Sequence, residues 1–240
     1  MNCLNAEQKI MPTKFLKNMK KIVCLLILVL FTSAFKQRKL PNVLIIGDSI
    51  SIGYTPFVKS ALRGKGNVFH NQGNAQHTGN GLEKLDDWLG DTKWDVIHFN
   101  WGLWDLCYRN PEVINQGNRD KKEGTVTFTP EQYDSNLEKL VLRLKNTGAK
   151  LIFATTTYVP EGEVGRFENA NIEYNKVALK IMKKYGVTVN YMSKISKEVY
   201  HKYAKGTGDV HYNMEGYSLL SIPVTEIIER KIQFSKHLSR

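Results

Sequence analysis

The chain has 240 residues and a net charge of +11, and 42% of its residues are hydrophobic. This length allows one domain with a sizeable core, and the composition excludes a disordered, collagenous or repeat protein. The basic residues are dispersed without a nucleic-acid-binding motif, so we expect a generally basic surface and no nucleic-acid partner. Attraction to an acidic polysaccharide or a cell envelope is the sharper alternative.

The N-terminus has the pattern of a secretory signal. Two lysines precede an apolar run at 22–31, and small residues follow it. This run is about half of the roughly 20 residues that a membrane span needs, so we expect cleavage rather than an uncleaved anchor. We therefore predict an extension and signal peptide at 1–34 and one folded domain at 41–235. The protein would be exported, periplasmic or secreted, without stable membrane insertion after cleavage.

The cysteines exclude a disulfide framework in the predicted domain. Cys3 and Cys24 lie in the extension, so cleavage leaves only Cys107. One cysteine forms neither an internal disulfide nor a thiolate metal cluster, and no histidine and carboxylate spacing suggests zinc. We expect no metal and no cofactor, and the sequence leaves the oligomeric state open.

Short apolar runs alternate with longer amphipathic stretches along the rest of the chain. In chain order they predict a strand at 42–46, a helix at 54–62, a strand at 68–69, a helix at 82–89, a strand at 94–99, a helix from Thr129 to a stop at Gly148, a strand at 150–154, a helix at 170–185, a strand at 187–189 and a helix at 215–232. This alternation predicts βαβ units with helices on both sheet faces. The expected fold class is α/β, a three-layer α/β/α sandwich with a mainly parallel five-stranded sheet.

In such sheets the ligand site lies beyond the carboxyl ends of the strands. The connection at 101–128 leaves one of these ends and is longer than usual, which is typical of functional or disordered loops. It carries basic residues that include Arg109 and Arg119. We therefore expect it to face the substrate.

The first predicted strand ends in Gly47-Asp48-Ser49. A serine at this turn lies at a helix N-terminus, where backbone N–H groups favour developing negative charge. Asp48 can brace the turn by a local hydrogen bond. By itself the triplet also fits a serine that only caps the helix.

Two further motifs supply the partners that a serine nucleophile needs. His211 precedes the last predicted helix, with Asp209 two residues before it, and a carboxylate can hold the tautomer of a general base. Asn100 and Gly102 follow the third strand, where an amide and a backbone N–H can stabilise an oxyanion. A tryptophan-rich packing corner is the alternative for this second segment.

Together these motifs resemble the SGNH hydrolase (GDSL esterase) superfamily over most of residues 41–230. PNVLIIGDSIS is similar to the first block of the family and DVHYNMEGY to its last block, and the segments at 131–160 and NIEYNKVA are similar to its connecting helices and fourth strand. The resemblance implies a flavodoxin-like fold with Ser49 as nucleophile and oxyanion donor and His211 as base.

The chain departs from the family pattern at three places. The family aspartate three residues before the histidine is Gly208 here, so Asp209 orients the imidazole, or the pair works as a dyad with a backbone carbonyl. Trp104 stands where the third block has asparagine, and we expect Asn100 to supply that amide. For the backbone donor of the second block, Gly73 and Gln76 are both candidates. Lastly, Asp48, Trp101 and Trp104 are expected to contact substrate.

The predicted function is that of a secreted serine esterase that hydrolyses O-acyl groups, chiefly acetyl, on a small-molecule or polysaccharide substrate. Export and the aromatic residues near the site, among them Tyr108 and Tyr158, favour carbohydrate. A lipase or thioesterase for longer acyl chains is one alternative, although the basic loop offers no obvious apolar groove. An inactive carbohydrate-binding relative is the other, and the residues at 104 and 208 favour it.

Overall fold

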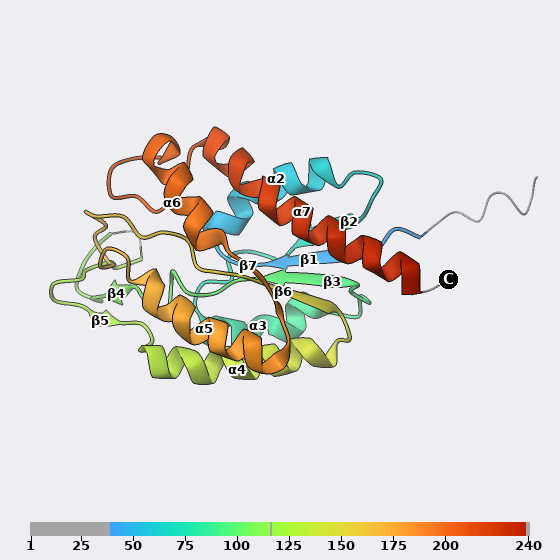
Figure 1. Ribbon diagram of the computed structural model, residues 1–240. Helices are drawn as coiled ribbons and strands as arrows, with labels where there is room; N and C mark the ends of the chain where they lie inside the picture. Colours follow the sequence, from blue (N-terminus) through green and yellow to red (C-terminus); the bar gives the residue numbers. More distant parts are fainter. Residues whose placement is uncertain (1–38, 116, 239–240) are drawn as a thin grey trace, which may run out of the picture. The chain divides into compact units, whose positions relative to one another are not determined.

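A five-stranded parallel sheet forms the centre of the computed structural model, which describes residues 39–115 and 117–238 (Figure 1). Its strand order is β2-β1-β3-β6-β7, and every neighbouring pair is parallel. The strands are β1 (Asn42–Ile46), β2 (Asn67–His70), β3 (Val96–Phe99), β6 (Lys150–Ala154) and β7 (Thr188–Asn190). The strand β3 is buried along its whole length because helices cover both faces of the sheet.

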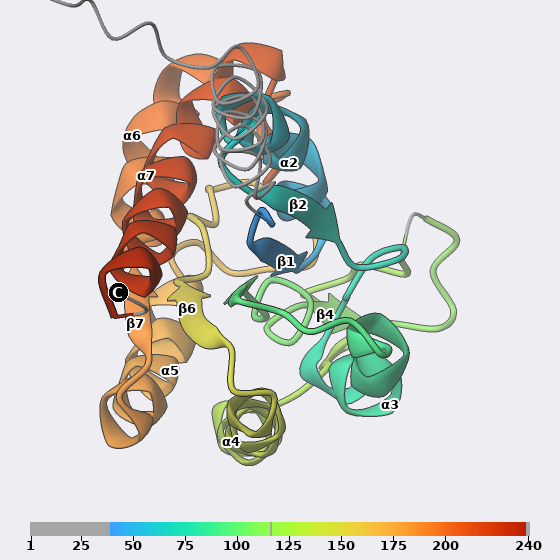
Figure 2. The same ribbon diagram turned by 90° about the vertical axis from the view of Figure 1, so that its right-hand side faces the viewer.

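Six helices form the two outer layers. They are α2 (Ser49–Ala61), α3 (Thr78–Leu89), α4 (Pro130–Asn146), α5 (Asn171–Tyr185), α6 (Met192–Tyr203) and α7 (Met214–Leu238). The helices α2 and α6 pack against α7 on one face, and α3 and α5 pack against α4 on the other (Figure 2). The predicted three-layer sandwich and its five-stranded sheet are therefore confirmed.

Local sequence signals account for several element boundaries. Thr129 and Gln132 form a reciprocal capping box at the start of α4, and Gly186 ends α5 in the left-handed conformation.

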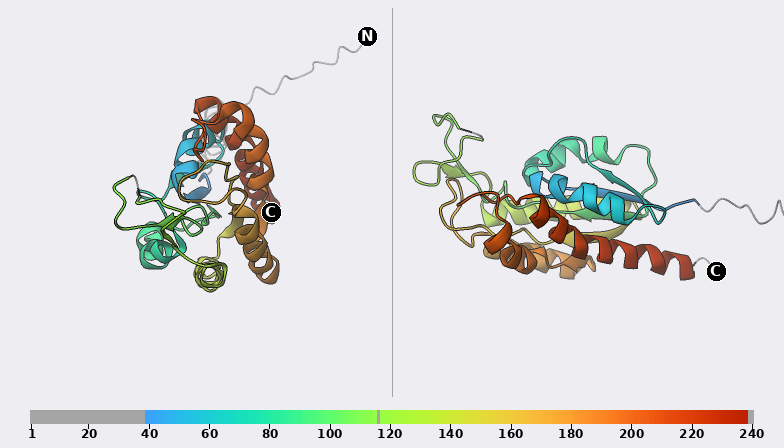
Figure 3. Two further views of the ribbon diagram at one scale, coloured as in Figure 1. Left: turned by 90° about the vertical axis from the view of Figure 1, so that its left-hand side faces the viewer. Right: turned by 90° about the horizontal axis from the view of Figure 1, so that it is seen from above.

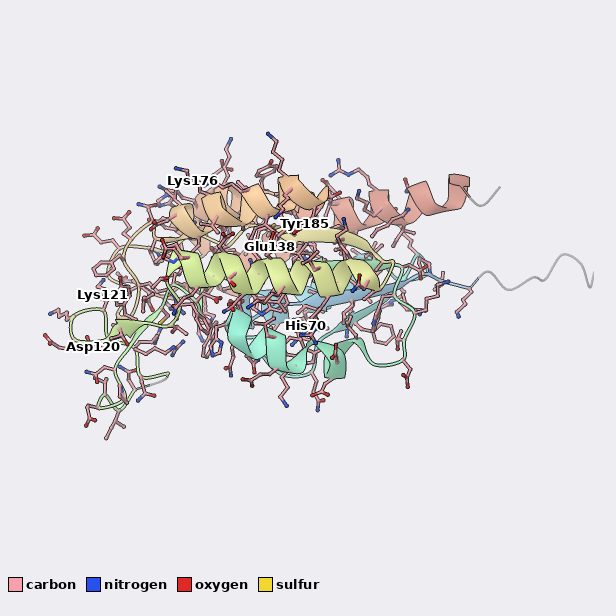
Figure 4. The ribbon with its side chains drawn as sticks, turned by 90° about the horizontal axis from the view of Figure 1, so that it is seen from below. His70, Asp120, Lys121, Glu138, Lys176 and Tyr185 are labelled. Atoms are coloured by element: carbon pink, nitrogen blue, oxygen red, sulfur yellow. The ribbon has the colours of Figure 1, made fainter. Side chains whose placement is uncertain are left out.

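The Glu138 carboxylate on α4 accepts hydrogen bonds from Lys184 and Tyr185 on α5, at 2.6 and 2.7 Å (Figure 4). These contacts join two neighbouring helices of one outer layer.

Other boundaries differ from the prediction. The helix α2 begins at Ser49, because the Asp48 side chain accepts the Ile50 N–H and caps it, and α3 begins at Thr78 with His77 as its cap. The helix α6 was not predicted. The connection at 101–128 contains an antiparallel pair, β4 (Tyr108–Arg109) and β5 (Thr125–Val126), which lies beyond the carboxyl end of β3 (Figure 3).

The remaining predictions concern the membrane and the N-terminal segment. No helix among the described residues is long and apolar enough to cross a membrane. The predicted signal peptide at 1–34 lies outside the described residues. All the elements named above belong to one unit, Leu40–Arg240.

Candidate active site

Ser49 lies at the tight turn between β1 and α2. A Cβ atom at Gly47 would come within 2.7 Å of the Ser51 Oγ, so this turn requires glycine. Ser49 is the first residue of α2, where a backbone N–H has no acceptor within the helix. The residue is half-buried, and its N–H and hydroxyl are therefore both available to a ligand at the positive end of the helix.

His211 joins the serine to a carboxylate. Its Nε2 lies 2.8 Å from the Ser49 Oγ, and its Nδ1 lies 2.5 Å from the Asp209 Oδ1. Because a carboxylate accepts, Nδ1 carries the proton and Nε2 accepts from the serine hydroxyl. The same Asp209 oxygen accepts the His211 backbone N–H at 3.0 Å, which fixes the short loop as well as the ring.

The carboxylate is suited to hold an imidazolium. Partial burial raises the pKa of Asp209, but the hydrogen bonds from His211 outweigh this effect and keep the pKa below its ordinary value. Asp209 therefore stays ionised at neutral pH. The structure also explains why position 208 is glycine: its φ is +71°, and a Cβ there would lie 2.7 Å from the Gly162 carbonyl oxygen.

Ser49 and His211 open into a pocket of about 110 Å³. Its other polar lining comes from segments that follow four different strands, β1, β2, β3 and β6. These lining residues are Asp48, Asn74, Trp104, Arg109, Arg119 and Arg166. Trp104 forms an aromatic wall, with the Arg109 guanidinium 4.5 Å from the ring centroid. Asp48 is buried, and burial raises the pKa of its carboxyl.

Two expected site residues lie elsewhere. The Asn100 amide donates to the Ala154 carbonyl at 2.7 Å and joins the ends of β3 and β6, so it does not line the Ser49 pocket. Trp101 is only 1% exposed and packs against Gly81, where a Cβ atom would lie 2.7 Å from the ring. Neither Asn100, predicted as an oxyanion donor, nor Trp101, predicted as a substrate contact, therefore lines the Ser49 pocket. Both side chains are taken up by core contacts.

Neither candidate for the second-block donor reaches the pocket. Gly73 is exposed and lies beside a separate concavity near His70. Gln76 has a positive φ of 52°, and its N–H donates to the Asn74 Oδ1 at 2.8 Å. Asn74 is the residue of this loop that lines the pocket. Asn74 was not predicted, because the donor expected from this segment is a backbone N–H and not a side-chain amide.

A buried carboxyl anchors the loop that carries Asn74. Asp105, one residue after Trp104, accepts from the N–H and the hydroxyl of Thr78 at 2.9 and 2.5 Å. Burial raises the pKa of Asp105 to about 7. This contact holds the start of α3, and with it the preceding loop, against the segment that follows β3.

The arginines come from both sides of the pocket. Arg109 and Arg119 belong to the basic connection that was expected to face the substrate. Arg166 follows β6 and was not predicted, although its place beyond a strand end was a signal for it. Arg119 and Arg166 both contact the Glu163 Oε1, at 2.9 and 2.8 Å. Glu163 is fully buried, so these two guanidinium groups are held at defined positions.

The described residues offer no site for a metal ion, since no three of their histidine, cysteine, aspartate or glutamate side chains cluster suitably. Asp120 and Lys121 lie on the connection between β4 and β5, next to Arg119 in the chain (Figure 4). Asp120 caps its own turn by accepting the Lys122 N–H at 2.9 Å, and Lys121 donates to the Glu163 carbonyl at 2.6 Å. These contacts order the segment that carries Arg119.

Comparison with solved structures places the fold among ester hydrolases. An acetyl xylan esterase, AlAXEase, is 14% identical with a TM-score of 0.63, over 78% of this chain and 99% of that one. A lipase/acylhydrolase from Enterococcus faecalis is 19% identical with a TM-score of 0.62, over 80% and 97%. An acetylxylan esterase from Geobacillus stearothermophilus is 18% identical with a TM-score of 0.61, over 80% and 94%.

These likenesses confirm the three-layer α/β fold that the sequence resemblance implied. No protein-family model matches the chain, and no curated protein matches it. Identities below one fifth establish the fold alone. The chemistry of this chain therefore depends on its own site.

Proposed function

We propose that the protein is an exported SGNH-type serine esterase that removes short O-acyl groups, chiefly acetyl, from carbohydrate. The observation that carries the proposal is the hydrogen-bonded chain from the Ser49 hydroxyl through His211 to Asp209. This is the arrangement of nucleophile, base and orienting carboxylate that acyl transfer requires. The acetyl xylan esterases among the structural neighbours support an acetyl ester as the substrate class.

In the first half of the proposed reaction, the Ser49 Oγ attacks the ester carbonyl carbon while His211 Nε2 takes the hydroxyl proton. The carbonyl oxygen becomes an oxyanion. When the intermediate collapses, the bond to the alcohol oxygen breaks, and His211 gives its proton to that oxygen. The alcohol leaves and the acyl group stays on Ser49.

In the second half, water attacks the acyl-enzyme while His211 takes one of its protons. The bond to the Ser49 Oγ then breaks, the serine recovers a proton from His211, and the carboxylic acid is released. Asp209 stays ionised throughout and stabilises the imidazolium that forms in each half. The histidine and the serine therefore return to their starting protonation states.

The oxyanion donors in this proposal are the Ser49 N–H and the Asn74 side-chain amide. The Asn74 Oδ1 accepts from Gln76, which leaves the Nδ2 group as the donor of this amide. Asn74 lines the pocket beside Ser49, and among the described residues no acceptor contacts its Nδ2. Asn74 would replace the asparagine that position 104 lacks.

The size of the pocket supports a short acyl group. A space of about 110 Å³ takes a group of few non-hydrogen atoms and no long acyl chain. Trp104 lines the pocket beside the Arg109 guanidinium and offers aromatic surface against which a sugar ring can pack. This combination favours acetylated carbohydrate over the longer-chain lipase or thioesterase alternative.

The test is release of acetate from 4-nitrophenyl acetate and acetylated xylan by the protein and by Ser49→Ala. We expect the variant to lose about a thousandfold or more of kcat, because the nucleophile is removed. Ser60→Ala, a substitution of an exposed serine on the same helix, is the matched control and should keep full activity. If the unaltered protein showed no turnover above that of Ser49→Ala, the proposal would be overturned and an inactive binding protein would be favoured.

A further inference from the structure

We infer that the Ser49 pocket selects esters that carry a negatively charged oxygen group, such as a carboxylate, close to the ester bond. The inference rests on the proposed function, because it names the substrate class of that same pocket. Its basis is the set of three guanidinium groups, those of Arg109, Arg119 and Arg166, that line the pocket together with Ser49 and His211.

The charge of the pocket lining is positive. Three arginines line the pocket against one carboxyl, that of Asp48. The Asp48 carboxyl is itself used as the α2 cap, since its Oδ1 accepts the Ile50 N–H at 2.9 Å. Glu163 lies behind Arg119 and Arg166 and supplies one negative charge for two guanidinium groups. In the lining itself, three guanidinium groups therefore face one carboxyl group.

Arg109 is the arginine best placed to meet a ligand. Its Nε donates to the Thr127 Oγ1 at 3.2 Å, and its Nη1 donates to the Gly117 carbonyl. No carboxylate among the described residues pairs with it, and its guanidinium plane lies over Trp104. The group is thus held by neutral partners only. An arriving oxyanion would be its first charged partner, through a charge-assisted hydrogen bond.

Arg166 is fixed more rigidly. It is 4% exposed, its Nε donates to the Leu103 carbonyl at 2.6 Å, and its Nη1 contacts Glu163. The second Glu163 oxygen accepts the Gly165 N–H at 2.7 Å. A buried arginine held in this way presents its remaining donors in a defined direction, which suits the planar geometry of a carboxylate.

Hydrolysis of a neutral acetyl ester develops one negative charge, on the carbonyl oxygen, and the proposed donors for that charge are the Ser49 N–H and the Asn74 amide, so three arginines exceed what it needs. Fixed cations that share a pocket with His211 oppose the imidazolium that forms during acyl transfer. A substrate anion bound to the arginines reduces their repulsion of the His211 imidazolium in the transition state. It also adds contacts between the substrate and the pocket. The arrangement therefore favours acidic esters at the catalytic step and in binding.

The anion can enter on either side of the ester bond, and two substrate pairs separate the sources. On the alcohol side, an acetylated methyl glucuronoside is compared with the identically acetylated methyl glucoside, which lacks the carboxylate. On the acyl side, 4-nitrophenyl hemisuccinate is compared with 4-nitrophenyl butyrate. We expect a higher kcat/KM for the acidic member of one pair, and that pair identifies the side. Equal kcat/KM values within both pairs would overturn the inference.

The variant Arg109→Gln tests the residue. We expect the ratio of kcat/KM for acidic over neutral substrate to fall by about tenfold or more, the value of a charge-assisted contact. A general loss of activity would leave this ratio unchanged. Arg109→Lys should give an intermediate ratio, because it keeps the charge but not the planar donor pair. Arg63→Gln, which removes an exposed arginine outside the pocket, should keep the original ratio.

A binding measurement separates failure of this inference from failure of the proposed function. Titration calorimetry of Ser49→Ala with glucuronate and with glucose requires no turnover. Binding of glucuronate in preference to glucose, and its loss in Ser49→Ala/Arg109→Gln, would support the anion site even if the protein hydrolysed no ester. Absence of that preference, together with equal kinetics in both substrate pairs, would leave an esterase without the anion site.

Discussion

Two concavities of the described residues carry several basic side chains each, and they differ in volume and in how those side chains are held. The Ser49 pocket has a volume of about 110 Å³ and is lined by buried or half-buried arginines. A groove lined by residues of α5 and α6 is larger, about 670 Å³, and Leu179 is among its lining residues. Exposed lysines surround the groove, among them Lys176, whose side chain Figure 4 labels on α5.

The larger of these two concavities is not the one that contains the candidate catalytic residues. The groove contains neither Ser49, His211 nor Asp209 in its lining. Its lysines are flexible and strongly hydrated, whereas the pocket arginines are oriented by Glu163, by Trp104 and by backbone carbonyls. A small pocket with fixed polar groups is suited to bind a reacting ester, because its groups need little reorganisation at the moment of reaction.

The largest effect that would sharpen this contrast comes from Asp209→Asn. We expect kcat on 4-nitrophenyl acetate to fall by about a thousandfold to ten-thousandfold, because an amide cannot hold the required tautomer of His211. Stopped-flow or steady-state kinetics measure the effect. Asp134→Asn changes an exposed aspartate on α4 and serves as the control. A loss below about tenfold would instead favour a Ser49–His211 dyad with a backbone carbonyl in the orienting role.

A smaller effect is expected from Asn74→Ala. Removing one oxyanion donor should lower kcat by about a hundredfold with little change in KM, because the contact forms chiefly in the transition state. The control is Gln72→Ala, in which an exposed side chain of the same loop is shortened. If both variants kept full kcat, Asn74 would be only a partner of Gln76, and the second oxyanion donor would have to be sought elsewhere in the pocket.

The smallest effect is expected in the groove. The double substitution Lys180→Glu/Lys183→Glu reverses two exposed charges there, and we expect kcat/KM for the acetyl esters to change by less than about twofold because salt screens exposed charges. The assay is the one used for Asn74→Ala. A loss as large as that of Asn74→Ala would contradict this distinction between the groove and the Ser49 pocket, because it would place the groove on the path of the substrate.

The strands and the order of the site motifs were predictable because they depend on local patterns. The run at 42–46 forms β1 with the predicted bounds, since its four consecutive apolar residues, Val43 to Ile46, are all buried. The helix α6 was missed because its residues follow β7 closely and carry mixed charges, so its apolar side becomes recognisable only where it packs on α7. The β4–β5 pair was missed because two-residue strands leave no periodicity.

The site was predictable only in part. The sequence by itself determined which residues are suited to be nucleophile, base and carboxylate, because their chemical types and chain order carry that information. Which amide and which cations face the serine was decided by the tertiary structure alone. Asn100 follows β3 and Asn74 follows β2, and both are asparagines just beyond the carboxyl end of a strand. Packing directs the first toward Ala154 and the second into the pocket, and it brings Arg166 beside Arg109 from a distant part of the chain.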